Sequence, residues 1–437
     1  MYTGSIVLML LGIKDLQADE DLGVKQQLRL LQQQNDALQE QLRRQQTLIE
    51  SLTRKVDQIE STTTRSGREL QDLAGEVKEA PKSKTFTFGN VSLSGEGGVA
   101  LFETGSRGTF PNAEFRIDEA KLFVEAPIWK DVYFYTELNL ATREQGDVSL
   151  HVGELYLDFE NVSRVWKQDR VLGLRIGRID IPFGEEYLTR DAIDNPLISH
   201  SLVDMWGVDE GLELYGWLGK VSYVAAIQNG GLSDVNDFDA DKSVTARVGF
   251  DPTRWLHASL SGMRTGQLDG NGDPWSALWF GNGFIRPLGA ATKFHAELVE
   301  GDLSFRLPRG HVSLSGGYVH YDDNEPGVDN QRDVYYYSVE VVHELTHKLY
   351  AAVRFSQVFA NDGFPILGNG QFGEYFFGYP TPAKLTEEIW RLSLGLGYRW
   401  GENLLTKAEY TFERGKVLGG ERREHEDLFA LEAAFKF

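Results

Sequence analysis

The sequence predicts an all-β transmembrane barrel of about sixteen antiparallel strands, preceded by an α-helical coiled coil. Its last segment alternates strictly, with Phe429, Leu431, Ala433, Phe435 and Phe437 on one face of a strand. Similar segments recur from residue 86 onward, separated by connections that are alternately short and long. No apolar run after the N-terminus reaches the 18 residues that a transmembrane helix needs. The chain is therefore expected to cross a membrane with strands.

The composition agrees with this fold class and excludes others. Hydrophobic residues make up 41% of the 437 residues, which is a modest share because a barrel exposes only alternate residues to lipid. Aromatic residues at 12% and 46 glycines suit short amphipathic strands with aromatic girdles. The absence of cysteine excludes disulfides, thiolate metal sites and covalent haem attachment. A net charge of −21 argues against nucleic acid as a partner.

The N-terminal residues 1–20 are predicted to be a signal peptide. A short apolar stretch at residues 5–13, followed by Leu16, Gln17 and Ala18, resembles the apolar region and cleavage end of a secretory signal. No Lys or Arg precedes the apolar stretch, which points to a truncated or misassigned start. An ordinary N-terminal extension is the alternative interpretation.

Residues 22–78 are predicted to form a periplasmic coiled coil. Core positions recur every seventh residue from Leu28 to Val77 and from Val24 to Leu73. Asn35, a polar residue at a core position, is of the kind that fixes register and strand number. The helix could also fold back on another domain, but its Gln-rich outer face favours self-association. Residues 79–85, which include a proline, are the expected linker to a barrel domain at residues 86–437.

The barrel strands are predicted from period-two alternation. The expected ranges are 91–103, 113–126, 132–141, 150–161, 171–182, 208–218, 221–228, 244–251, 256–265, 293–307, 311–321, 334–344, 349–359, 389–400, 404–413 and 428–437. Short turns alternate with long loops, which is typical of an even-stranded barrel with both ends in the periplasm. The last strand should close on the first near Val91. A terminal aromatic such as Phe437 also resembles the assembly signal of bacterial outer-membrane barrels.

Three segments in the middle of the chain resemble the phosphate-selective porin O and P family. They are residues 174–184 (LRIGRIDIPFG), 211–216 (GLELYG) and 226–230 (AIQNG), and the resemblance extends over most of residues 86–437. It implies a trimer of sixteen-stranded barrels, each narrowed by an infolded third outer loop. That loop would be residues 183–207. The resemblance leaves the selectivity of the pore open.

Strand parity predicts which charged side chains face the lumen. Trp390, Leu392 and Leu394 are expected to face lipid, which places Arg391 on the opposite face. The basic residues predicted to line the pore are Arg391, Arg399, Arg354, Lys407, Arg247 and Arg175. On the early strands the same parity places mostly acidic residues inside: Glu119, Glu125, Glu137, Glu154, Asp158 and Glu213, with Lys121. The predicted constriction loop carries Glu185, Glu186, Arg190, Asp191, Asp194 and Asp204.

This distribution leads to a hypothesis about the constriction. An acidic loop that faces a basic wall would create a transverse field and screen permeants by charge. Lumen charges that merely hydrate a wide channel are an equally weighted alternative. Phosphate specificity would require basic side chains that converge on one point, and the sequence does not show such a cluster.

Three motifs suggest other chemistry. His343 and His347 match the spacing of a zinc-protease helix, but the residues before them alternate with period two, and on a strand the two histidines would lie ~13 Å apart. Residues 368–373 (GNGQFG) match a dinucleotide fingerprint without its strand, turn and helix context. Acidic loops offer weak Ca²⁺ ligands, namely Asp269, Asn271 and Asp273, and Asp237, Asp239 and Asp241. Because neither loop has Glu at the twelfth position, solvated loops are the favoured interpretation.

We therefore expect a porin in the bacterial outer membrane for passive diffusion of small hydrophilic, charged solutes, with phosphate or other anions among the candidates. The expected partners are membrane lipid, lipopolysaccharide and two further copies of the chain. The alternative is a structural anchor whose coiled coil tethers or spaces the envelope. The sequence offers no set of nucleophile, base and orienting group, so an enzyme is not expected. No cofactor is expected beyond Ca²⁺ in the outer loops.

Overall fold

The computed structural model describes residues 86–142, 150–231, 236–237, 239–268, 276–281, 283–285, 293–325, 328–370 and 385–437. The predicted signal peptide, coiled coil and linker lie outside the described residues, and these predictions stay predictions. Among the described residues, no helix has the length and apolar character needed to cross a bilayer.

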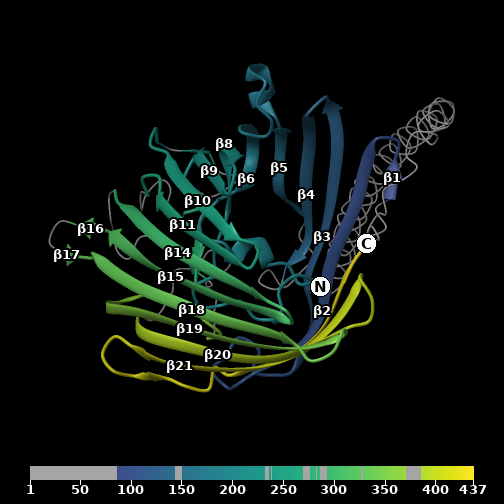
Figure 1. The fold of residues 1–437 in the computed structure, drawn as a ribbon. Coiled ribbons are helices and arrows are strands. Elements are labelled where there is room, and N and C mark those ends of the chain that lie inside the picture. Colours follow the sequence, from purple (N-terminus) through teal and green to yellow (C-terminus); the bar gives the residue numbers. More distant parts are fainter. Residues whose placement is uncertain are drawn as a thin grey trace, which may run out of the picture. The chain divides into compact units, whose positions relative to one another are not determined.

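Sixteen long strands form one antiparallel sheet that closes on itself (Figure 1). They are β2 (Val91–Thr104), β3 (Glu114–Trp129), β4 (Val132–Thr142), β5 (His151–Phe159), β6 (Gly173–Asp180), β8 (Val208–Leu218), β9 (Val221–Gln228), β10 (Ser243–Thr253), β11 (Leu256–Arg264), β14 (His295–Leu307), β15 (Gly310–Asp322), β18 (Arg332–Glu344), β19 (Leu349–Phe364), β20 (Thr386–Arg399), β21 (Leu404–Val417) and β23 (Leu428–Lys436). The predicted barrel of about sixteen antiparallel strands is confirmed.

Shorter elements accompany these strands. Strand β1 (Phe86–Phe88) pairs with the start of β2, and β22 (Arg422–Arg423) pairs with the end of β21. Two 3₁₀ turns, η1 (Val162–Trp166) and η2 (Glu186–Thr189), follow β5 and β6 respectively. The other short strands are β7 (Met205–Trp206), β12 (Trp279–Phe280), β13 (Gly283–Phe284), β16 (Asn324–Glu325) and β17 (Val328–Asp329).

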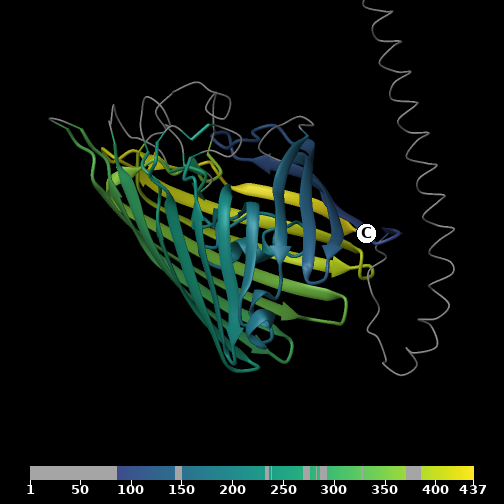
Figure 2. The same cartoon turned by 90° about the horizontal axis from the view of Figure 1, so that it is seen from above.

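The last strand closes the barrel by pairing with the first long strand. Glu96 stands opposite Lys436 and Thr104 opposite Leu428 in an antiparallel ladder. The ladder continues to Phe437, whose backbone N–H donates to the carbonyl of Gly95 at 2.8 Å. Figure 2, turned by 90° from Figure 1, shows the long strands running side by side around the barrel. Closure leaves the long strands without an unpaired edge, which a membrane-spanning sheet requires.

The strands begin and end close to the predicted positions. Strands β8 and β9 have the predicted bounds, whereas β19 extends to Phe364 and β21 to Val417. The alternation that signals a lipid-facing strand stops earlier, at Phe359, whereas pairing with β20 resumes at Phe364 after an irregularity. Periodicity therefore marks the membrane-facing part of a strand, and backbone hydrogen bonds carry the strand further.

Side chains alternate between the two faces of the barrel wall. On β20, Leu394 and Leu396 are 41% and 50% exposed on the outer face, whereas Arg391 and Ser393 are each 1% exposed on the inner face. Strand β8 repeats the pattern, with Leu212 exposed outside and Glu213 buried inside. The outer face is thus an apolar surface suited to lipid, and the inner face carries the charges.

An apolar cluster lies inside the barrel and positions the segment between β6 and β8. Ile181, Phe183, Leu202 and Met205 of this segment pack with inward-facing wall residues that include Phe364. The same segment contributes β7 to a small three-stranded sheet with β12 and β13, in which the rings of Trp206 and Trp279 stack 5.3 Å apart. Burial of these apolar side chains stabilises the segment inside the barrel.

Candidate functional site

We name residues 181–207 the inner loop. At Gly184 the chain turns away from the barrel wall. This residue has φ +65, and a Cβ there would meet the carboxylate of Glu300. Its N–H donates to the Ser261 hydroxyl at 3.1 Å, and its carbonyl accepts from the Arg247 guanidinium. A side chain at this position would be strained and crowded, so glycine directs the chain inward here.

Two buried arginines on the opposite wall bind the inner loop through its backbone. Arg391 Nη1 donates to the carbonyl of His200 at 2.6 Å, and Arg354 Nη1 donates to the carbonyl of Ser199 at 2.8 Å. Arg354 Nη2 also reaches the Asn195 side-chain oxygen at 2.9 Å. The planar guanidinium, with its fixed set of donors, suits this recognition of several carbonyls.

Strand β21 supplies two further anchors for the inner loop. Lys407 Nζ donates to the carbonyls of Ala192 and Leu197 at 2.7 and 2.8 Å. The carboxylate of Glu409 accepts from the N–H of Ile198 and of Ser199 at 2.5 and 2.8 Å. Both anchors are buried, so loss of the inner loop would leave several of their hydrogen-bonding positions unsatisfied.

Each of the three buried basic side chains also has a carboxylate from a neighbouring strand. Arg391 pairs with Glu413 at 2.6 Å, and Arg354 pairs with Glu340 at 2.5 Å. Lys407 likewise pairs with Glu432 at 2.7 Å. The charges of the late-strand wall are thus compensated locally, which burial requires.

The structure therefore differs from the predicted arrangement of an acidic loop that faces a basic wall across open space. The inner loop packs directly on the wall that carries Arg354, Arg391 and Lys407. These side chains use their donors on loop carbonyls, because buried N–H groups must find acceptors. The charge pattern of the sequence did not predict that these basic side chains bind backbone carbonyls.

The other predicted basic residues lie elsewhere on the inner face. Arg175 is bound by two carboxylates, Asp158 at 3.0 Å and Glu213 at 2.9 Å. Arg399 is exposed near the end of β20, and its guanidinium carbon lies 4.8 Å from the centre of the Tyr350 ring. The six predicted basic residues therefore do not converge on one point.

Two acidic residues of the inner loop stabilise the loop itself. Glu186 accepts a hydrogen bond from the N–H of Ser201 at 2.9 Å. Burial, together with the nearby charge of Asp204, raises the pKa of Glu186 to about 7. Asp204 binds Arg190 and His200, each at 2.9 Å. Burial disfavours its charged form, but these two partners outweigh burial and hold the pKa of Asp204 below its usual value.

The remaining acidic residues of the inner loop lie toward the early strands. Glu185 contacts His257 Nε2 at 2.7 Å, and Asp194 is exposed. Asp191 forms an ion pair with Lys121 of β3. Although burial disfavours its charged form, the ammonium of Lys121 holds the pKa of Asp191 below its usual value.

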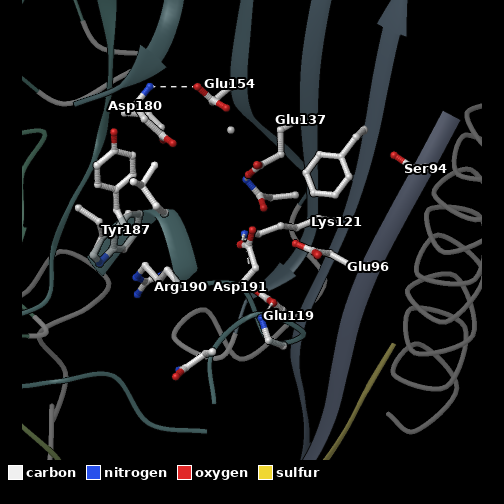
Figure 3. Close-up of a pocket in the computed structure, with 18 of the residues that line it drawn as sticks. Ser94, Glu96, Glu119, Lys121, Glu137, Glu154, Asp180, Tyr187, Arg190 and Asp191 are labelled. Carbon is white, nitrogen blue, oxygen red and sulfur yellow. Dashed lines mark hydrogen bonds and ion pairs between the residues drawn. The ribbon is translucent and has the colours of Figure 1, made fainter. Parts of the chain in front are cut away.

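A cavity of about 690 Å³ remains between the inner loop and the wall formed by β2 to β6 (Figure 3). Its basic side chains are those of Lys121, Arg190, His151 and His200. Its carboxylates, eight in number, are those of Glu96, Asp118, Glu119, Glu125, Glu137, Glu154, Asp180 and Asp191. The described lining is thus strongly acidic, with neutral polar and aromatic side chains between the charges.

Three of these carboxylates meet where the inner loop touches the wall. Figure 3 shows Glu96, Glu119 and Lys121 from the wall beside Asp191 of the loop. Oxygens of Glu96, Glu119 and Asp191 lie within 4.8 Å of one another, and Lys121 Nζ lies 3.5 Å from Glu119. Oε1 of Glu96, a residue only 7% exposed, has no hydrogen-bond partner in the described part of the chain.

Sequence reasoning missed part of this lining. Glu96, Asp118 and Asp180 were not among the predicted lumen residues. Glu96 could have been found, because Ser92 and Ser94 share its polar face of β2. The structural role of Glu409 gave no sequence signal, since its partners are backbone N–H groups distant in the chain.

The predicted calcium ligands lie outside this cavity. Asp237 pairs with Lys242, and Asp241 lies 3.2 Å from Arg264. Asp239 accepts a hydrogen bond from the N–H of Asp241 at 2.7 Å. Among the described residues, these three do not form a cluster with metal-ligand geometry. The other predicted set, Asp269, Asn271 and Asp273, lies outside the described residues.

The two histidines of the zinc-protease pattern lie at the end of a strand, as the local alternation predicted. His343 belongs to β18, which ends at Glu344, and His347 lies in the following turn. Both side chains are exposed, and the pattern lacks the helix that would bring the histidines onto one face.

Comparison with known proteins supports the fold. No family model and no curated protein matches the sequence. The outer membrane channel DcaP of Acinetobacter baumannii is a similar solved structure, with a TM-score of 0.55 and 12% identity, over 79% of this chain and 97% of that chain. The chain has the fold of an outer-membrane porin.

Two further porin structures are similar at low sequence identity. The outer membrane protein OmpT of Vibrio cholerae gives a TM-score of 0.54 at 10% identity, over 81% of this chain and 100% of that chain. An anion-selective porin from Comamonas acidovorans gives 0.51 at 9% identity, over 79% of this chain and 98% of that chain. At such identities the fold is shared, and the permeant must be argued from the chain's own residues.

Proposed function

We propose that the chain is an outer-membrane channel for passive diffusion of small hydrophilic solutes. The observation that carries this proposal is the cavity of about 690 Å³ between the inner loop and the wall of β2 to β6. Sixteen strands enclose more width than their own side chains fill, which is typical of water-filled barrels. The inner loop narrows this space against one wall and leaves the polar cavity beside the other.

The anchoring of the inner loop fits a fixed constriction. Five inward-facing side chains, Arg247, Arg354, Arg391, Lys407 and Glu409, bind its backbone along the path from Gly184 to His200. Hydrogen bonds at several points leave the loop few alternative positions. The diameter of the passage is then set by the wall and the loop together, as a size-limited diffusion channel requires.

Selectivity for phosphate or other anions is the finer form of this function that the family resemblance implies. It would need basic side chains that converge on open space. Of the six predicted basic residues, all except Arg399 bind loop carbonyls or neighbouring carboxylates, as in the cases of Arg391 and Arg175. We therefore base the proposal on diffusion of charged solutes in general.

The remaining features of the proposal concern the protein's surroundings. We place the barrel in the bacterial outer membrane, in contact with lipid and lipopolysaccharide, because large apolar side chains such as Leu260 and Leu396 are exposed on its outer face. A trimer and a periplasmic coiled coil remain part of the proposal on the basis of the sequence.

Single-channel recording of the full-length protein in planar lipid bilayers tests the proposal. We expect ohmic current steps in KCl, and grouped steps of equal size if the barrels assemble as trimers. Absence of steps from protein that migrates as a folded barrel would contradict the channel function. That result would favour the alternative function, in which the barrel anchors a coiled coil that tethers or spaces the envelope.

A further inference from the structure

The lining of the cavity is unbalanced in charge. Its eight carboxylates stand against one lysine, one arginine and two histidines. The lysine and the arginine are already engaged, since Lys121 binds Asp191 and Arg190 binds Asp204. A narrow passage with low-dielectric walls and charge of one sign concentrates ions of the opposite sign.

The basic side chains that could balance this charge are held on the other side of the inner loop. Arg354, Arg391 and Lys407 are each at most 6% exposed and lie against loop carbonyls. Each is also paired with a carboxylate on its own wall, so its charge is compensated there. Their field in the cavity is correspondingly weak, because the paired charges form local dipoles.

The carboxylate cluster where the loop meets the wall already binds a cation of the chain itself. The ammonium of Lys121 lies between Glu119 and Asp191. A third carboxylate beside them, Glu96, is buried and has an Oε1 without a hydrogen-bond partner in the described residues. The cluster thus holds a cation of the chain among carboxylates at the point where the inner loop touches the wall.

We propose that the passage selects for small cations and for solutes that carry an amine, and discriminates against anions. This inference rests on the proposed channel function and specifies its substrate class. Carboxylates such as Glu125 and Glu137 line the cavity beside the inner loop and attract positive charge, whereas the lysine and the arginine of the described lining are each paired with a carboxylate. Selection arises from the carboxylates along the passage and needs no binding site of high affinity.

The reversal potential of the full-length channel in a KCl gradient tests the inference. We expect the sign that corresponds to K⁺ permeation, with a K⁺/Cl⁻ permeability ratio of about three or more. In liposome swelling, we expect lysine to enter faster than glutamate, a solute of similar size. A ratio at or below one, or equal swelling rates, overturns the inference for the unmodified protein.

Paired variants locate the selectivity in the passage. Glu125→Gln/Glu137→Gln removes two carboxylates from the cavity, and we expect the K⁺/Cl⁻ ratio to fall at least about twofold. Asp362→Asn/Glu421→Gln removes the same charge from exposed positions outside the cavity and should leave the ratio unchanged. An equal fall in both pairs overturns the inference, because the selectivity would then reflect overall charge.

The two proposals fail in different ways. Absence of current steps overturns the channel function and the selectivity with it. Ohmic steps with a reversal potential of the opposite sign leave the channel function intact and overturn the cation preference alone. Both measurements use the unmodified protein, so the test of the inference does not depend on whether a variant folds.

Discussion

Arg391 on β20 donates from Nη1 to the backbone carbonyl of His200, 2.6 Å away inside the barrel. The two residues are 191 positions apart in the sequence. This contact fixes the inner loop against the late strands and leaves the acidic cavity on the other side of the loop. The position of the passage therefore depends on a contact between a side chain and a backbone group.

Substitution of Arg391 should release the inner loop. Arg391→Ala removes the contact with His200 and deprives the buried carboxylate of Glu413 of its nearest cation, which costs about 3–5 kcal/mol. We expect a lower midpoint of unfolding in urea and larger, noisier current steps. The double variant Arg391→Ala/Glu413→Gln is the control, since it removes the unpaired charge. Stability should recover in part, whereas the current noise should persist.

Glu409 provides a second and independent test of the anchoring. Glu409→Gln replaces a carboxylate that accepts from two loop N–H groups, and should weaken the anchoring by about 1–3 kcal/mol. Limited proteolysis within residues 181–207 should then accelerate. Glu388→Gln alters a carboxylate on the neighbouring strand that binds Gln357 at 2.8 Å and is not in contact with the loop. Equal acceleration in both variants would argue against a specific anchor.

The inner loop should become less stable as the pH rises. The pKa of Glu186 is raised to about 7 by burial and by Asp204, against a usual value of 4.5. The folded state thus binds more protons than the unfolded state in this range, so the stability from protonated Glu186 is complete below about pH 4.5 and is lost as pH rises through about 7. Proteolysis of the loop should be slower at pH 5 than at pH 8. Glu186→Gln should flatten this dependence, and an unchanged profile would exclude Glu186 as its source.

Gly177, within the segment that resembles the phosphate-selective porins, should be required for pairing of β5 and β6. Its φ is +144, and a Cβ there would lie 2.8 Å from the Cα of Tyr156 and against the carbonyl of Leu155. Gly177→Ala should reduce stability by about 1–3 kcal/mol, measured as the urea midpoint. Gly262→Ala is the matched control in a strand, because the nearest atom to its Cβ is 3.9 Å away. Similar losses in both variants would exclude a local cause.

The sequence predicts which face of the wall a side chain occupies, and the structure adds what lies against that face. Parity placed Glu119, Glu137 and Glu154 on the inner face, and all three line the cavity. Parity also placed Arg354 and Lys407 on the inner face, but it could not show that the inner loop covers them. A period-two pattern records which face a side chain occupies, and it carries no information about what lies against that face.

The amino-acid sequence by itself determined the number of strands, their approximate ends and their inner and outer faces. Those properties follow from local alternation, because each strand meets lipid on one side and a polar interior on the other. Only the tertiary structure decided which wall the inner loop packs on and which charges remain beside the passage. That choice depends on long-range hydrogen bonds that backbone groups of the inner loop form with Arg391, Lys407 and Glu409. Almost every residue carries the same backbone groups, so the sequence does not mark which of them are bound.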